Sequence, residues 1–249
     1  MKNKRLLIIL SCLAFVAIVA LSLNALFTVA EVQTVFSVSS TQGQTDAELC
    51  EEVFEKYKGK NLTLFKTSKV KKDVAHLPYL KVESVQKKST NKLIITVSER
   101  LEVFSLSVDG AIYTFDKEGF VLAQKEENFN NADGAANVLI VADTTTCTVG
   151  KTIEFADKQK QTAVFDAASC FDDFRNQVEK MYFSSSVVPY LYVQMRTGAT
   201  IVLDYTAQNM TDKLSSALSV YDAQPEYQKF SGYVVESGDG FIWTSRAPL

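Results

Sequence analysis

Apolar and polar positions divide the chain into an apolar N-terminal stretch and a longer part with mixed patterning. The stretch covers residues 6–27, begins with Leu6, ends with Phe27 and contains no charged side chain. A helix rises about 1.5 Å per residue, so this stretch reaches roughly 30 Å, the thickness of the hydrocarbon layer of a membrane. The pattern therefore predicts one transmembrane helix at residues 6–28.

Three positive residues precede this stretch, namely Lys2, Lys4 and Arg5. Because positive flanks stay in the cytoplasm, residues 1–5 are expected to be a short cytoplasmic tail, and the bulk of the chain is expected to be extracytoplasmic. A cleaved secretory signal is the alternative, since small residues follow the stretch, although the apolar core of a signal is usually only about 7–15 residues long.

The pattern behind the apolar stretch first predicts a strand and a helix. Residues 32–38 alternate between apolar and polar side chains, as a strand does. After a turn at residues 41–44, Thr45 and Glu48 have the spacing of a capping box, which marks a helix start. This helix is expected to stop at Gly59.

A second helix and two strands complete the first half. Thr67 or Ser68 can cap the helix, and Pro78 ends it because proline disfavours helical geometry in the residue before it. Residues 80–87 and 92–98 read as strands around a polar turn. The predicted order is strand, helix, helix, strand, strand.

This order, directly behind a single apolar helix, resembles a POTRA domain, and its details resemble the bacterial cell division family FtsQ/DivIB. Glu102 stands where that family usually has a proline. The resemblance is carried by Gly59-Lys60-Asn61-Leu62, Leu77-Pro78-Tyr79 and Leu93-Ile94-Ile95-Thr96-Val97-Ser98-Glu99-Arg100.

Turn signals predict a hairpin at the start of the second half. Asp109 and Gly110 lie between two apolar runs, and this dipeptide favours a tight hairpin turn. Residues 113–121 are similar to the hairpin that opens the second domain of the family, called the β domain. Residues 124–137 are polar and are expected to form a loop.

The rest of the second half mixes helices and strands. From about Asp157 the apolar spacing predicts a long amphipathic helix that reaches Val178. Residues 190–203 read as a hairpin, Asn209 as the cap of a further helix, and residues 232–236 as a last strand.

Together these patterns and the resemblance predict an α+β protein. It is expected to contain the transmembrane helix, a POTRA domain at residues 29–100 and a β domain at residues 101–237. The β domain is expected to combine helices with a mainly antiparallel sheet. Residues 238–249 are expected to form a flexible C-terminal tail.

The sequence carries no recognisable catalytic, metal or cofactor motif. Gly-x-Ser-x-Gly, Gly-x-x-x-x-Gly-Lys-Ser and His-Glu-x-x-His patterns are absent, and His76 is the only histidine. Adjacent acids such as Glu51 and Glu52 do not face one another on a helix. The net charge of −3 lacks the basic footprint of a nucleic-acid-binding protein. We therefore expect a non-enzymatic protein without a metal or a cofactor.

Two further groups leave alternatives open. Cys147 and Cys170 are the favoured pair for a disulfide, with buried free thiols as the alternative. Lysines near the predicted membrane could meet anionic lipid or cell-wall polymer, or could be solvated faces; they are Lys69, Lys71, Lys72, Lys87 and Lys88.

The resemblance implies a protein that binds other division proteins. Its last strand could offer an edge to partners similar to FtsB/DivIC and FtsL, or could simply complete its own sheet. The expected function is to scaffold the division complex at the septum in the cell membrane and to help regulate the septal peptidoglycan synthase and transpeptidase. The alternatives are a membrane-anchored cell-envelope enzyme and another POTRA-bearing secretion or assembly module. The predicted partner-binding residues are Tyr233, Val234, Val235 and Glu236.

Overall fold

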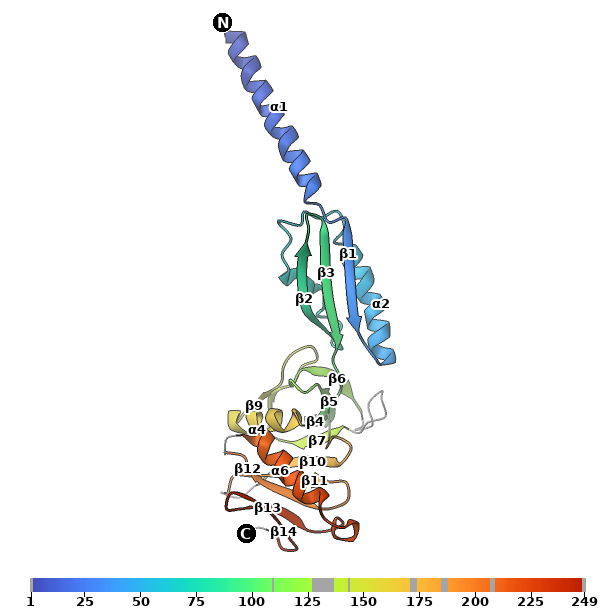
Figure 1. Cartoon of the computed structure of the whole chain (residues 1–249), viewed down its shortest axis with the longest axis vertical. Coiled ribbons are helices and arrows are strands. Elements are labelled where there is room, and N and C mark those ends of the chain that lie inside the picture. The colour runs from blue at the N-terminus through green and yellow to red at the C-terminus, as the bar shows by residue number, and fades with distance from the viewer. Residues whose placement is uncertain are drawn as a thin grey trace. The chain divides into compact units, whose positions relative to one another are not determined.

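The computed structural model divides the chain into two compact units, Met1–Glu99 (unit 1) and Arg100–Leu249 (unit 2). Most of their strands and helices are labelled in Figure 1. The structure describes residues 2–108, 110–126, 137–142, 144–170, 174–184, 188–206 and 209–247, without the side chains of residues 2–9, 20, 23 and 144–146.

Unit 1 begins with the helix α1, Lys2–Leu26. Within the part of the chain that the structure describes, no helix is both long enough and apolar enough to cross a membrane. The predicted span starts at Leu6, and the side chains of residues 2–9 lie outside those described. The transmembrane assignment therefore stays a prediction.

The remaining elements of unit 1 follow the predicted order of strand, helix, helix, strand and strand, which is confirmed. Strand β1 pairs in parallel with β3, and β2 pairs with β3 in antiparallel fashion, so that β3 is central. Helices α2 and α3 share a buried cluster with this sheet, in which Phe54, Tyr57 and Leu93 are almost fully buried. The elements are β1 (Glu31–Ser37), α2 (Thr41–Glu55), α3 (Ser68–Val74), β2 (Leu80–Lys88) and β3 (Lys92–Glu99).

Helix α2 begins five residues earlier than the capping box indicated. Ser40 is its N-cap, and the Ser40 hydroxyl accepts a hydrogen bond from the Gly43 backbone N–H at 2.9 Å. The predicted turn at residues 41–44 is therefore the first turn of the helix. The prediction failed because Gly43 and the capping box both read as signs that the helix had not yet begun.

Glu99, at the end of β3, explains this early start. Its carboxylate accepts hydrogen bonds from the backbone N–H groups of Ser39 and Ser40 at 2.7 and 3.1 Å, and from both serine hydroxyls. A Cβ atom at Gly43 would lie 2.4 Å from Glu99 Oε1, so the glycine makes room for the carboxylate. Burial raises the pKa of Glu99, but the serine hydrogen bonds outweigh it and lower the pKa below its ordinary value of 4.5.

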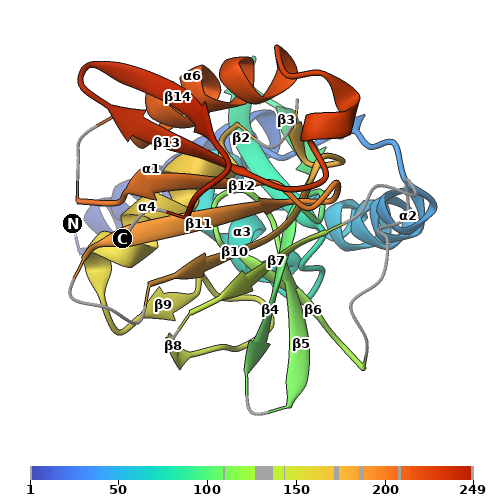
Figure 2. The same cartoon turned by 90° about the horizontal axis from the view of Figure 1, so that it is seen from below.

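Unit 2 is built on a mixed sheet with the strand order β14-β13-β12-β11-β10-β7-β4-β5-β6. Figure 2 shows the strands in this order. Five of the eight described pairings are antiparallel, which confirms a mainly antiparallel sheet. The strands up to β11 are β4 (Phe104–Val108), β5 (Ala111–Phe115), β6 (Val121–Lys125), β7 (Val138–Val141), β10 (Val178–Phe183) and β11 (Tyr190–Met195). The sheet continues with β12 (Thr200–Asp204), β13 (Tyr233–Ser237) and β14 (Gly240–Thr244), and β8 (Thr144–Thr146) pairs separately with β9 (Glu154–Phe155).

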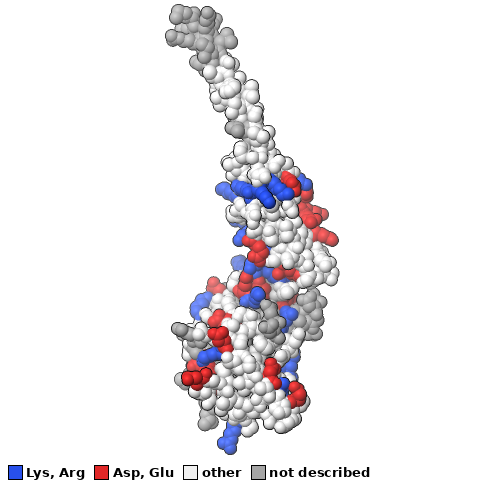
Figure 3. All heavy atoms as spheres, in the orientation of Figure 1, with Lys and Arg blue, Asp and Glu red and all other residues white. Residues whose placement is uncertain are grey.

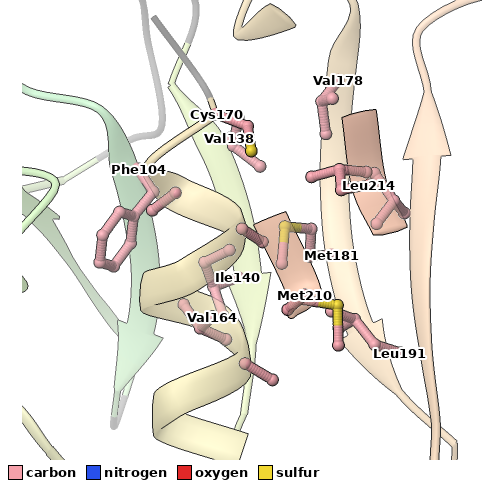
Figure 4. Close-up of a cluster of buried hydrophobic side chains, with 14 of the residues drawn as sticks. Phe104, Val138, Ile140, Val164, Cys170, Val178, Met181, Leu191, Met210 and Leu214 are labelled. Atoms are coloured by element: carbon pink, nitrogen blue, oxygen red, sulfur yellow. The ribbon is translucent and has the colours of Figure 1, made fainter. Parts of the chain in front are cut away.

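Two helices share one hydrophobic core with this sheet. They are α4 (Lys158–Ala168) and α6 (Met210–Asp222), and a short 3-10 helix η1 (Glu226–Gln228) follows. Figure 4 shows Val164 of α4 and Leu214 of α6 among strand residues such as Ile140 and Met181, and all four are at most 1% exposed. The core therefore joins elements that lie far apart in the sequence.

The long helix predicted from Asp157 to Val178 is wrong at Ser169 and Cys170, which form a turn, and at Val178, which is in a strand, while residues 171–173 lie outside the described residues. Asp157 does cap α4, and its side chain accepts hydrogen bonds from Gln159 N and Lys160 N. The helix ends at Ala168, and β10 begins at Val178, where it pairs with β7 and β11. A strand buried between two neighbours shows no alternation strong enough to separate it from a helical pattern.

Smaller predictions have mixed outcomes. The hairpin of β4 and β5 is confirmed by antiparallel pairing, and Gly110 has a φ of +81°, while Asp109 lies outside the described residues. Asn209 is the N-cap residue of α6, but with a φ of +64° and without the predicted side-chain cap.

Most of the predicted loop at residues 124–137 lies outside the described residues. The four cysteines are free thiols, so the Cys147–Cys170 disulfide is not formed.

Glu102, which replaces the proline of the resembled motif, is only 6% exposed. Its carboxylate lies 2.6 Å from Lys125 Nζ and accepts hydrogen bonds from Thr114 Oγ1 and Asn137 Nδ2. Its backbone oxygen accepts a hydrogen bond from Arg175 at 2.7 Å. At the position where the motif has a proline, this chain therefore has a buried carboxylate. Its ion pair and hydrogen bonds come from several elements of unit 2.

We expect the Glu99→Gln variant to lose about 1–2 kcal/mol of unfolding free energy at neutral pH, because charge-assisted hydrogen bonds are weakened. The folded pKa of Glu99 lies below its unfolded value, so this contribution is complete above the ordinary value of 4.5 and is lost as pH falls through the folded pKa. The difference between variant and wild type should therefore shrink in acid. Urea unfolding across pH measures it.

The matched control is Glu48→Gln, at an exposed position on the same helix α2. It should leave the unfolding free energy within about 0.5 kcal/mol of the wild type. A Glu99→Gln variant as stable as this control would contradict the stabilising role of the carboxylate.

Candidate functional site

The C-terminal hairpin of unit 2 forms one end of the described sheet. Strand β13 lies between β12, its parallel neighbour, and β14, its antiparallel neighbour. Residues 240–244 of the predicted flexible tail therefore form a strand, and Gly238, with a φ of +58°, lies in the turn between the two strands. The premise that β13 is the edge strand is wrong, because β14 covers it.

The structure places the four predicted partner-binding residues in different surroundings. Val234 is fully buried in the core, whereas its neighbours Tyr233 and Val235 are partly exposed on the other face of the sheet. Glu236 Oε2 lies 2.7 Å from Lys213 Nζ of α6, and Glu236 Oε1 accepts a hydrogen bond from Asp204 N at 3.1 Å. Val234 thus serves packing and Glu236 joins α6 to the sheet, while their contact with a partner stays a prediction.

Alternate side chains of β14 have different roles. Phe241 and Trp243 are partly buried and pack against the hydrophobic core. Gly232, with a φ of +135°, allows this packing, because a Cβ atom there would lie 2.5 Å from the Trp243 ring. Ile242 points to the other face and is 49% exposed. The strand is therefore anchored by two aromatic side chains and presents an isoleucine at the end of the sheet.

Ile242 continues a row of apolar side chains across the sheet. In successive strand pairings, Ile242 is opposite Val235, Val235 opposite Val202, and Val202 opposite Tyr192. Tyr192 in turn stacks on Tyr182 with 5.0 Å between the ring centroids. Burial, with smaller effects of the nearby Tyr192 and Tyr233, raises the pKa of Tyr182. Through Ile242, strand β14 therefore has an apolar residue on the face of the sheet opposite Phe241 and Trp243.

A surface hollow of about 510 Å³ lies beside the hairpin, between α6 and the start of β14. Its polar lining contains three acids and one lysine. Lys213 and Glu236 of the lining form an ion pair with each other, so Asp212 and Asp239 give the lining a net negative charge. Its lining comprises Asn209, Asp212, Lys213, Ser216, Val220, Glu236, Gly238, Asp239, Gly240 and Phe241.

This arrangement fits binding of a polypeptide. An end strand offers backbone N–H and C=O groups to which a strand of another chain can add, and the exposed side chains then select the partner. Among the described residues, no three or more His, Cys, Asp and Glu side chains gather as ligands for a metal ion. Burial raises the pKa of Cys50 to about 12 and that of Cys147 to about 11, which keeps both thiols protonated.

The sequence contained a signal for β14 that the prediction did not use. Phe241, Ile242 and Trp243 are three consecutive residues of a type that favours strands. The Gly238-Asp239 pair between Ser237 and Gly240 is also a dipeptide that favours a two-residue hairpin turn. Together these signals predict a final hairpin. The end strand of the sheet is then the strand that contains Ile242 and not the strand that contains Val234.

Comparisons with known proteins give a distant likeness to solved structures. No protein-family model matches the chain, and no curated protein matches it. A solved structure, the major extracytoplasmic domain of the trans isomer of the cell division protein DivIB from Geobacillus stearothermophilus, is 13% identical. The alignment covers 47% of this chain and 87% of that chain, with a TM-score of 0.29.

We expect Val234→Glu and Ile242→Glu to affect stability very differently. Val234 is fully buried, so an unpaired carboxylate there should cost about 3 kcal/mol or more. Ile242 is half exposed, and its substitution should cost less than about 1 kcal/mol. Chemical unfolding of the two variants checks this. Equal destabilisation would contradict the placement of β14 at the end of the sheet.

Proposed function

We propose that this chain is a non-enzymatic cell division protein of the FtsQ/DivIB type. In this proposal α1 anchors it in the cell membrane as a single pass, unit 1 is a POTRA domain, and unit 2 is a β domain that binds other division proteins. The chain acts by holding partners together, and catalysis belongs to the enzymes that the partners regulate.

The observation that carries the proposal is the topology of unit 1. A strand, two helices and two strands follow an apolar N-terminal helix, and the first strand pairs in parallel with the last. The order of these elements is the one on which the POTRA resemblance rests, and both helices share a buried cluster with the sheet β1-β3-β2. The quoted motifs occupy the corresponding places, since Leu77-Pro78-Tyr79 lies between α3 and β2.

The end strand of unit 2 supports the binding role. Strand β14 carries the exposed Ile242 on one face of the sheet, and its two aromatic side chains fix it to the core on the other face, where Phe241 also lines the acidic hollow. We propose that partners similar to FtsB/DivIC and FtsL bind here by adding a strand or a helix to this edge. Confinement to one membrane raises the effective concentration of such partners, so a modest interface suffices.

The proposed cellular location of the chain and the process that it affects follow from these partners. The complex is proposed to assemble at the division septum, where it helps regulate the septal peptidoglycan synthase and its transpeptidase. Binding at β14 would make assembly dependent on a surface of this chain, whereas an envelope enzyme would depend on a catalytic group.

We expect the full chain, purified in detergent, to bind the full-length FtsB/DivIC-like partner of the same organism. Ile242→Glu should weaken this binding at least about tenfold, because it places a charge in the centre of the proposed interface. Affinity is measured by titration with a labelled partner, alongside the FtsL-like protein.

The matched control is Val149→Glu, which replaces another half-exposed apolar residue of unit 2, outside the hairpin. It should bind as the wild type does. A wild-type chain that ignores both partners at high micromolar concentration would contradict the proposed function. Unchanged binding by Ile242→Glu would instead remove β14 from the interface.

A further inference from the structure

Lysines gather at the end of unit 1 to which α1 is joined. Between residues 56 and 72 the sequence has seven lysines and no acidic residue, and residues 85–92 add three more lysines. Figure 3 shows Lys and Arg side chains as a band at this end of unit 1. The sequence alone left these lysines as separate clusters, whereas the fold brings them together.

Backbone hydrogen bonds hold the lysine-bearing segments against the end of α1. Val29 N donates to Lys60 O at 2.8 Å, Leu62 N donates to Phe27 O at 2.6 Å, and Ala30 N donates to Asn91 O at 2.8 Å. Asn61 also donates a side-chain hydrogen bond to Asn24 of α1. The loop after α2, the β2–β3 turn and the end of α1 therefore form one surface.

Four of these lysines surround a surface hollow of about 660 Å³, and we call them the lysine rim: Lys60, Lys66, Lys69 and Lys72. All four are exposed, and within the described chain no ion pair joins any of them to a carboxylate. Asp73, the acid in the lining, accepts a hydrogen bond from the buried Tyr57 hydroxyl at 2.8 Å. Burial and this hydrogen bond raise the pKa of Tyr57.

An apolar side chain stands among the lysines. Leu64 lines the same hollow and is 79% exposed, the highest exposure among the large hydrophobic residues that the structure describes. Positive charges around a protruding leucine are complementary to a layer that is anionic at its surface and apolar beneath. A water-soluble anion would satisfy the lysines but would leave Leu64 exposed to water.

We propose that the lysine rim and Leu64 bind the headgroup layer of an anionic phospholipid membrane. The proposal rests on the proposed membrane anchoring of α1, whose exposed apolar side chains, such as Leu21 and Leu26, begin at this end of unit 1. Lysines near an anionic membrane surface are attracted within about one Debye length, roughly 8 Å at physiological salt. Binding therefore holds this end of unit 1 at the membrane in a salt-dependent way.

The test measures the reactivity of lysines towards acetylation in the full chain. The chain is mixed with vesicles of phosphatidylcholine alone and with vesicles that also contain phosphatidylglycerol. We expect acetylation of the four rim lysines to slow at least about threefold only with phosphatidylglycerol, and the protection to disappear in high salt. Lys151 and Lys158, exposed in unit 2, serve as internal controls and should keep their rates.

Two variants and a soluble competitor complete the test. Leu64→Ser should reduce the protection of the rim, whereas Val149→Ser should not. Equal rim reactivity with both kinds of vesicle would overturn the proposal. Protection by a soluble glycerol phosphate polymer, but not by anionic vesicles, would overturn it in favour of a wall polymer.

The anchoring is read separately, from flotation of the full chain with neutral vesicles. Flotation with neutral vesicles without rim protection on anionic ones would leave the anchor in place and refute the rim. Rim protection on anionic vesicles without flotation on neutral ones would support the rim and refute the anchor.

Discussion

Backbone hydrogen bonding in the nine-stranded sheet is the constraint on which unit 2 depends. Each interior strand uses its N–H and C=O groups on both sides, so within the described sheet only the end strands β14 and β6 have an open side. The β6 end is partly covered, because Val121 N donates to Lys151 O and Gly150 N donates to Val121 O, both at 2.9 Å. Strand β14 is the more open end, and its position decides where another chain can add.

Local patterns predicted unit 1 well because its elements are short and separated by turn signals. The order of its elements follows from periodicity, Gly59 and Pro78. What the sequence could not reveal are contacts between distant residues. Glu99 lies about sixty positions from the two serines that it joins to β3, and this contact moves the start of α2 to Ser40. Glu102 likewise is only a departure from a motif in the sequence. In the fold, Lys125 and Asn137 contact its carboxylate.

Unit 2 was predicted less completely, for two physical reasons. Val178 has the helical spacing of the apolar residues in α4 and was taken as the end of a long helix, although it is the first residue of β10, which is paired on both sides. At the C-terminus, the turn after β13 resembled the start of a loose tail, although Phe241 and Trp243 pack on the core. The four predicted partner-binding residues therefore lie on the inner strand of the C-terminal hairpin, whose most exposed apolar residue is Ile242.

The central claim is that β14 is the strand to which a division partner binds. Hydrogen–deuterium exchange of the full chain, with and without the FtsB/DivIC-like protein, tests it most directly. A partner strand added to the edge would pair the open amides of β14, so exchange at residues 240–244 should slow while amides of β6 keep their rates. Bound partner with unchanged exchange in β14, and protection elsewhere, would contradict the claim.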